Sequence, residues 1–159
     1  MPISVLDPID KRILEALQRD GRLTNVELAQ ESGLSPSPCL RRMKILEKNG
    51  VIEGYRAVLD RGRVGLGVTV FVGINLQRHS DEDADAFTAA ILEMPEVVSC
   101  HIVSGDTDFL LEVVAPDLRA YSEQVLTKLL TLPGIKDIRS SFSMKTVKSP
   151  SPLPLDHVE

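Results

Sequence analysis

The chain has 159 residues, of which 43% are hydrophobic, 26% are charged and 4% are aromatic, and it contains no Trp. That hydrophobic content supports packed cores and excludes a disordered chain, while the few aromatic side chains argue against a stacking platform for single-stranded nucleic acid. The formal net charge of −5 is uneven: residues 1–60 hold nine basic and nine acidic side chains, whereas residues 61–159 hold nine and fourteen. The acidic excess therefore belongs to the second part of the chain.

The sequence has no feature of a secreted or membrane protein. Its two cysteines, Cys39 and Cys100, are too few for a disulfide framework and form no C-x-x-C pair. No segment approaches the roughly 20 apolar residues that span a bilayer, and the N-terminus lacks the apolar run of a signal peptide. We expect a cytoplasmic protein with no membrane partner.

The first predicted helix begins at Asp7-Pro8, with Asp7 as its cap and Pro8 at its first helical position. Ile9, Ile13 and Leu17 recur at four-residue spacing and form an apolar stripe. Asp20-Gly21 ends the helix.

Two further helices are predicted in TNVELAQESGLSPSPCLRRMKILEKNG, the stretch that follows. Thr24 and Glu27 have the spacing of a capping box, and Gly33 suits the left-handed end of the same helix. Ser35 is expected to cap the next helix, with Pro36 at its first position. These helix-start and helix-end residues predict a helix-turn-helix.

The second of these helices has two opposed faces. Cys39, Met43 and Leu46 fall on one side of the helical wheel, and a polar stripe with several cations falls on the other. Cations on an exposed helix neutralise DNA phosphates, and Arg can bond guanine bidentately. An ordinary solvated basic face is the alternative, but the capped two-helix pattern favours binding in the DNA major groove. The residues predicted to contact DNA are Ser35, Ser37, Pro38, Arg41, Arg42, Lys44 and Lys48.

Residues 51–67 connect the helices to a region of different composition. Residues 51–59 suggest a short extended segment, either a wing or a strand, and the Gly-rich residues 61–67 suggest a hinge.

From Val68 onward the pattern alternates between strands and helices. VTVFVGINL is long and β-branched enough for a strand that could be buried on both faces. The predicted elements are strand 68–76, helix 81–93, strand 97–104, strand 108–115, a helix from Asp117 to Pro133 and strand 135–147. This order is the split βαβ, ferredoxin-like arrangement, a single antiparallel sheet with helices on one face. Its other face needs cover, for which a second copy is the expected source.

Short motifs are spread over both halves of the chain. They include Asp20-Gly21-Arg22, Gly33-Leu34-Ser35, Cys39-Leu40-Arg41-Arg42, Gly50-Val51-Ile52, Gly54-Tyr55, Ser104-Gly105-Asp106-Thr107-Asp108, Leu132-Pro133-Gly134-Ile135 and Ser140-Ser141-Phe142. With these motifs, the combination of domains resembles the leucine-responsive/asparagine-regulator (Lrp/AsnC) family of transcription factors over about residues 9–148.

The resemblance implies an α+β protein with a winged-helix-like helix-turn-helix domain and a ferredoxin-like βαββαβ domain. It further implies a sequence-specific DNA-binding regulator of amino-acid metabolism, without a cofactor, that forms homodimers and assembles to octamers. The implied division is residues 1–60 for DNA binding, 61–67 as the hinge, 68–148 for effector binding and oligomerisation, and 149–159 as a Pro/Ser-rich tail.

By the same resemblance, an amino-acid effector binds at a subunit contact. The implied residues are Ser104, Gly105, Asp106, Thr107 and Asp108, completed by Leu118, Ser141 and Ser143 of a neighbouring subunit. Turn N–H groups at 105–107 can hold an α-carboxylate, and Asp106 or Asp108 can pair with the α-ammonium. On the residues alone, Gly105-Asp106 is also a good hairpin turn, and the resemblance favours the effector loop.

Two alternatives remain. An enzyme is disfavoured because His79, His101 and His157 are scattered without metal-ligand spacing, and no phosphate loop or nucleophile elbow occurs. A metabolite-sensing module whose helix-turn-helix contacts protein is disfavoured by the basic stripe.

Overall fold

The structure is a computed structural model that describes residues 6–77 and 81–157. The chain divides into two compact units, each with its own hydrophobic core. The first unit runs to Val58 and takes in the chain again from Lys148, and the second is Leu59–Val147. Among the described residues, no helix is long and apolar enough to cross a membrane.

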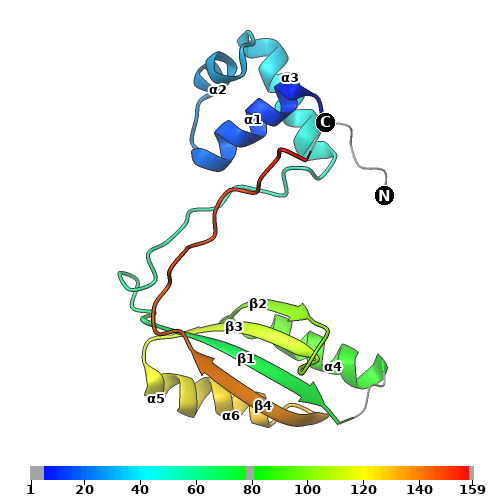
Figure 1. Ribbon diagram of the computed structural model, residues 1–159, viewed down its shortest axis with the longest axis vertical. Helices are drawn as coiled ribbons and strands as arrows, with labels where there is room; N and C mark the ends of the chain where they lie inside the picture. The colour runs from blue at the N-terminus through cyan, green and yellow to red at the C-terminus, as the bar shows by residue number, and fades with distance from the viewer. Residues whose placement is uncertain (1–5, 78–80, 158–159) are drawn as a thin grey trace. The chain divides into compact units, whose positions relative to one another are not determined.

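The first unit is built from three helices, α1 (Pro8–Arg19), α2 (Asn25–Ser32) and α3 (Pro36–Lys48) (Figure 1). The predicted caps are confirmed at α1, where the Asp7 carboxylate accepts the N–H groups of Ile9 and Asp10. They are confirmed at α2 by the Thr24–Glu27 capping box.

The turn between α2 and α3 differs from its prediction at one residue. Gly33 is left-handed, with φ of 73°, as expected for a helix end. Ser35 stands at the N-cap of α3 and Pro36 at its start, as predicted, but the Ser35 side chain makes no capping hydrogen bond. The Asn25 side-chain amide instead donates to the Pro36 carbonyl oxygen at 2.9 Å, joining the starts of α2 and α3.

The apolar stripes of the helices meet in one core. Ile13 of α1, Leu28 of α2, and Cys39 and Leu46 of α3 are buried there, and Met43 packs against them half-buried. The inward face predicted for the second helix of the helix-turn-helix is therefore confirmed.

The Pro/Ser-rich tail lies against α1 of its own unit. The Gln18 side chain accepts the Leu153 N–H at 2.6 Å and donates to the Leu153 carbonyl at 3.2 Å. Lys11 pairs with Asp156 at 3.1 Å, and Leu155 packs against the core.

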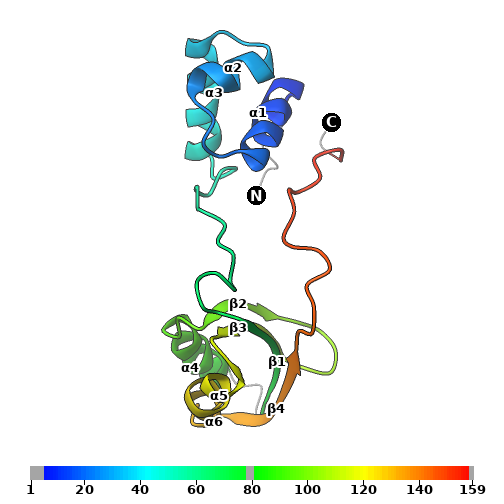
Figure 2. The same ribbon diagram turned by 90° about the vertical axis from the view of Figure 1, so that its left-hand side faces the viewer.

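The second unit is built from β-strands and α-helices. They are β1 (Val68–Leu76), α4 (Asp81–Leu92), β2 (Val97–Ile102), β3 (Phe109–Ala115), α5 (Leu118–Ala120), α6 (Thr127–Leu130) and β4 (Ile135–Phe142). The strands form one antiparallel sheet of order β2-β3-β1-β4. Figure 2 shows α4 and the α5–α6 segment on the same side of this sheet. The predicted α+β, ferredoxin-like class is confirmed.

The helix predicted after Asp117 contains a π-helical stretch. Asp117 caps it by accepting the Ala120 N–H at 2.7 Å, and residues Tyr121–Leu126 between α5 and α6 are π-helical. The Tyr121 ring is buried there, with its hydroxyl 2.5 Å from the Ser140 hydroxyl of β4. This contact fixes the helix against an edge strand.

The sheet has one buried face and one open face. Val70, Val72 and Ile74 of β1 are fully buried beneath the helices, where Phe87 packs on Phe109 with ring centroids 4.6 Å apart. On the opposite face of β1, Phe71 is 42% exposed. In this chain, burial of β1 on both faces is therefore contradicted at Phe71.

The connection between the units has neither helix nor strand in residues 51–60 and forms a turn in residues 61–65. No strand is assigned in residues 51–60, so the predicted wing or strand has no ladder within the described chain. The region predicted as a hinge is a hydrogen-bonded turn, in which the Leu66 N–H donates to the Arg61 carbonyl at 2.7 Å. Arg61 Nη1 also contacts Glu112 at 2.7 Å and Thr69 at 3.0 Å, which fixes the turn to the sheet.

We expect Phe87→Ala to destabilise the second unit by about 3–5 kcal/mol, because it removes a fully buried ring and leaves a cavity. Leu92→Ala, on the same helix but 79% exposed, is the control and should change stability by less than about 0.5 kcal/mol. Hydrogen exchange followed by mass spectrometry on peptides from residues 59–147 measures both. Equal effects would contradict the core described here.

Candidate DNA-binding and effector sites

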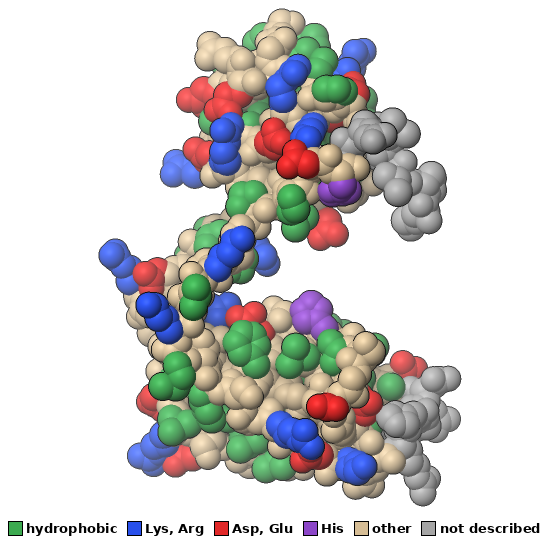
Figure 3. All heavy atoms as spheres, in the orientation of Figure 1, with side chains coloured by type: hydrophobic (Ala, Val, Ile, Leu, Met, Phe, Trp, Pro, Cys, Tyr) green, Lys and Arg blue, Asp and Glu red, His purple; other side chains and the backbone are tan. Residues whose placement is uncertain are grey.

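The outer face of α3 presents the polar stripe. Ser37, Arg41, Lys44 and Lys48 are exposed along it, as is Ser35 just before its first turn. Pro38 is half-buried in that turn. Over the face of the first unit seen in Figure 3, by contrast, basic and acidic side chains are interspersed.

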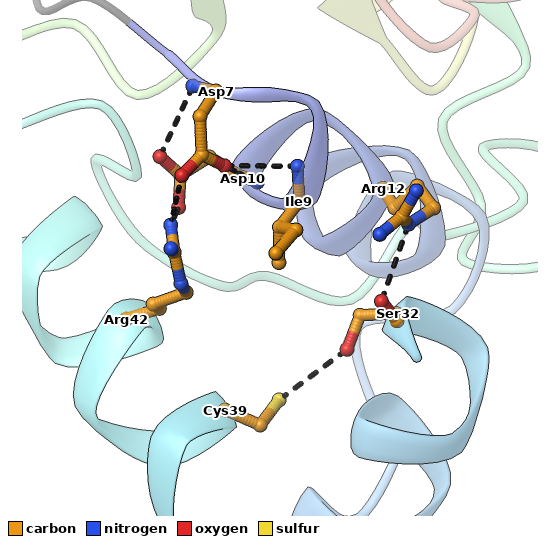
Figure 4. A network of polar contacts seen from close by, with 7 residues as sticks. All are labelled: Asp7, Ile9, Asp10, Arg12, Ser32, Cys39 and Arg42. Carbon is orange, nitrogen blue, oxygen red and sulfur yellow. Dashed lines mark hydrogen bonds and ion pairs between the residues drawn. The ribbon is translucent and has the colours of Figure 1, made fainter. Parts of the chain in front are cut away.

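Arg42 is held inside the first unit. Its guanidinium lies 2.6 Å from Asp7 and 2.9 Å from Asp10, both at the start of α1 (Figure 4). These hydrogen bonds, first with Asp10 and then with Asp7, raise the pKa of Arg42. These ion pairs engage Arg42 within the first unit, and the DNA contact predicted for it stays a prediction.

The same network, shown in Figure 4, ties all three helices together. Arg12 Nε donates to the Ser32 carbonyl at the end of α2, at 3.2 Å. The buried Ser32 hydroxyl donates to the Leu28 carbonyl at 2.8 Å and lies 3.8 Å from Cys39 Sγ of α3. These contacts set the angle at which α3 leaves the turn.

The residues expected to bind an effector fall into two groups. The first is the connection between β2 and β3, residues 104–108, which we call the effector loop. Ser104, Gly105 and Asp106 are exposed, while Thr107 and Asp108 are half-buried. The Leu76 N–H donates to Asp108 Oδ2 at 2.9 Å, so this carboxylate anchors the loop to the end of β1.

Sequence reasoning missed two β1 residues that contact this loop. Asn75 Nδ2 donates to the Asp106 carbonyl at 3.0 Å, and Asn75 Oδ1 accepts the Asp108 N–H at 3.1 Å. Gly73 faces Thr107 so closely that an added Cβ would lie 2.6 Å from Thr107 Cγ2. The available sequence signal was a glycine within a predicted strand, because such a glycine often marks a place where another part of the backbone or a ligand approaches closely.

The second group lies at the other end of the sheet. The Ser143 N–H donates to the Thr69 carbonyl at 2.9 Å, and Ser141 pairs with Phe71. Leu118 follows Ala115, which pairs with Val68 at the start of β1. At about 3.4 Å per residue, the five steps of β1 from Thr69 to Ile74, beside the loop, span about 17 Å.

One chain therefore does not bring the two groups together. A site containing both requires the loop of one copy and the β4 end of another, the arrangement that the resemblance implies.

The open face of the sheet carries apolar side chains beside a histidine. Phe71 and Leu110 are 42% and 37% exposed, and His101 pairs with Leu110 across β2 and β3. Figure 3 shows hydrophobic side chains gathered around a histidine over these strands. A face of this kind suits contact with another protein surface.

Within the described chain, no cluster of three or more His, Cys, Asp or Glu side chains could hold a metal ion. Burial raises the pKa of the Cys100 thiol. Cys100 and His101 pair with Leu111 and Leu110 respectively, so their side chains alternate across the strand. His79 lies outside the described residues.

Both parts of the chain match models of known protein families. Residues 69–153 match the family model for the Lrp/AsnC ligand binding domain. Residues 6–53 match a winged helix-turn-helix DNA-binding model. The chain belongs to the Lrp/AsnC family.

Relatives of this family match along nearly the whole chain. The leucine-responsive regulatory protein of Salmonella typhimurium is 45% identical, over 90% of this chain and 87% of its own length. A transcriptional regulator of Neisseria meningitidis, solved as an L-Met complex, is 43% identical with a TM-score of 0.92, covering 97% of this chain and 99% of its own. The feast or famine regulatory protein of M. tuberculosis, complexed with L-methionine, is 32% identical with a TM-score of 0.84 and the same coverage.

In Asp7→Asn, the new amide can still cap α1, but it cannot form the ion pair that Asp7 makes with Arg42. We therefore expect this variant to have a lower melting temperature than the wild type at pH 7. Hydrogen bonds from the Asp10 N–H and then from Arg42 lower the pKa of Asp7 below its ordinary 3.8, against the opposing effect of burial. The stability from the ionised carboxylate is therefore complete above pH 3.8 and is lost as pH falls through the folded-state pKa.

Thermal melts of the wild type and Asp7→Asn over a pH series measure this difference. The gap between their melting temperatures should narrow below pH 3.8. A gap that stays constant to acid pH would show that the ion pair does not stabilise the first unit.

Proposed function

We propose that this protein is a transcriptional regulator that binds DNA through α3 and senses an amino acid at the effector loop. The observation that carries the DNA-binding half is the stripe of Arg41, Lys44 and Lys48, exposed on the helix whose opposite face is buried. Relatives of similar length are regulators, and two of them form complexes with L-methionine.

At the DNA, the cations of α3 supply phosphate contacts and Arg41 supplies a donor pair for guanine. A dimer places two such helices in successive major grooves, so the operator is roughly palindromic. Ser35 and Ser37 near the start of α3 are additional phosphate or base partners, with Pro38 bordering them.

Assembly into dimers rests on the open sheet face. A second copy covering Phe71 and Leu110 would bury apolar surface that one chain leaves exposed. Dimers then associate further, up to an octamer, and contacts between copies bring Leu118, Ser141 and Ser143 to a neighbour's effector loop. The effector changes DNA binding by favouring one assembly over another, since a ligand shifts an equilibrium only through differential affinity.

We divide these roles along the two compact units. DNA contact belongs to the first unit, and sensing and assembly belong to Leu59–Val147. We assign the protein no catalytic activity and place it in the cytoplasm with the DNA that it regulates.

The alternative is a sensing module whose helix-turn-helix contacts protein. The exposed cations of α3 favour DNA, because a protein interface disfavours unpaired charge at its core. Operator binding distinguishes the two.

We expect Arg41→Ala with Lys44→Ala to weaken operator binding and to reduce the salt slope, log Kd against log[salt], by about 1 for each DNA phosphate that the variant no longer neutralises. Arg119→Ala is the matched control, because this Arg is 83% exposed but lies in the second unit. Fluorescence anisotropy with a duplex operator at several salt concentrations measures both. Unchanged affinity in the double variant would mean that α3 does not read DNA.

We expect one or a few of the twenty amino acids to raise the melting temperature of the purified protein, because a ligand that binds only the folded state stabilises it by mass action. Asp106→Asn should reduce that shift, since it removes an exposed carboxylate that can pair with the α-ammonium. Gln124→Ala, a change distant in sequence from the loop, controls for general destabilisation. A shift unaltered in Asp106→Asn would remove Asp106 from the site.

A further inference from the structure

We propose that Gly73 and Asn75 of β1 are positioning residues that hold the effector loop in its ligand-binding conformation. This inference rests on the proposed function, because it assigns to these two residues a role in amino-acid binding. Both lie on the open face of the sheet, since side chains two apart on a strand share a face.

Asn75 controls the direction of a peptide group within the loop. Its Nδ2 donates to the Asp106 carbonyl at 3.0 Å, which turns that carbonyl toward β1. In a trans peptide the N–H points opposite to the C=O, and no peptide bond described here is cis. The Thr107 N–H is therefore directed away from Asn75.

The contacts of Asn75 leave a run of N–H groups available. Within residues 6–77 and 81–157, the N–H groups of Gly105, Asp106 and Thr107 donate no hydrogen bond, whereas the Asp108 N–H donates to Asn75 and to the Ile74 carbonyl. Consecutive N–H groups in a turn form an anion-binding concavity. An α-carboxylate bound there would accept hydrogen bonds from these N–H groups.

Gly73 sets how closely the loop approaches the sheet. An added Cβ would lie 2.6 Å from Thr107 Cγ2 and 3.5 Å from Thr107 Cβ, so a side chain at this position displaces the loop. Thr is β-branched and stiff about χ1, which prevents it from turning aside freely. Thr107 can therefore lie this close to β1 only when residue 73 is glycine.

The two carboxylates of the loop consequently have different roles. Asp108 accepts the Leu76 N–H and anchors the loop at the end of β1. Asp106 is exposed at the tip, where its backbone is fixed by Asn75. We assign the α-ammonium contact to Asp106 and an anchoring role to Asp108.

The test is isothermal titration calorimetry of the full-length protein with L-methionine and with L-leucine. Gly73→Ala should weaken binding about tenfold, since displacing the loop costs on the order of one hydrogen bond of binding free energy. Adding Thr107→Ser to Gly73→Ala removes the clashing methyl and should restore affinity to within about threefold of the Thr107→Ser single variant.

Asn75→Asp tests the hydrogen bonds with little change of shape. It places a carboxylate oxygen against the Asp106 carbonyl and should weaken binding about tenfold. Gln77→Ala is the matched control, because this amide at the same end of β1 donates to the Ile135 carbonyl at 3.2 Å and, among the described residues, forms no hydrogen bond with the loop. Gln77→Ala should bind as the wild type does.

Operator affinity without amino acid, measured alongside for Gly73→Ala, Asn75→Asp and Gln77→Ala, should be unchanged, which separates loop positioning from general damage. If the wild type binds an amino acid and Gly73→Ala and Asn75→Asp bind it equally well, the positioning role is overturned while the proposed function stands. Failure of Thr107→Ser to rescue Gly73→Ala also overturns it. A wild type that binds neither amino acid overturns this inference together with the sensing function.

Discussion

The second unit depends on one constraint: its helices cover one face of the sheet only. The covered face holds a closed core, in which β1 contributes alternate buried residues from Val70 to Ile74. The other face is left with Phe71 and Leu110 partly in water. Because burying apolar surface lowers the free energy, this face suits the second copy that we propose to cover it.

β1 has a central place in that arrangement. It pairs with β3 on one side and β4 on the other, so its two ends border both groups of candidate effector residues. Near its start, Thr69 meets Ser143 and the Arg61 turn; near its end, Asn75 and Gly73 meet the effector loop. Within one chain, β1 therefore links the effector loop to the strand end that carries Ser141 and Ser143.

In the first unit, two neighbouring arginines of α3 have different surroundings. Arg41 and Arg42 are neighbours in the sequence and on the same helix, but Arg41 faces solvent and Arg42 is bound to Asp7 and Asp10. Arg42 links α3 to the start of α1, and Arg41 is exposed on the face that we propose to meet DNA. The orientation of the recognition surface thus depends on ion pairs formed behind it.

The sequence by itself determined the helices of the first unit, the order of strands and helices in the second, and the two faces of α3. These features are encoded locally, by caps such as Asp7 and Thr24 and by the periodicity of apolar residues, so neighbouring residues suffice to predict them. The family followed from motifs that are likewise short and contiguous.

Only the tertiary structure decided which polar side chains were already engaged. Arg42 was assigned to DNA from its helix alone, but its partners lie 32 and 35 residues away in the sequence. Asn75 was missed because the loop it holds lies 31 residues further on. Such contacts depend on how elements pack, and the residue pattern of one element carries no record of which side chain faces it from another.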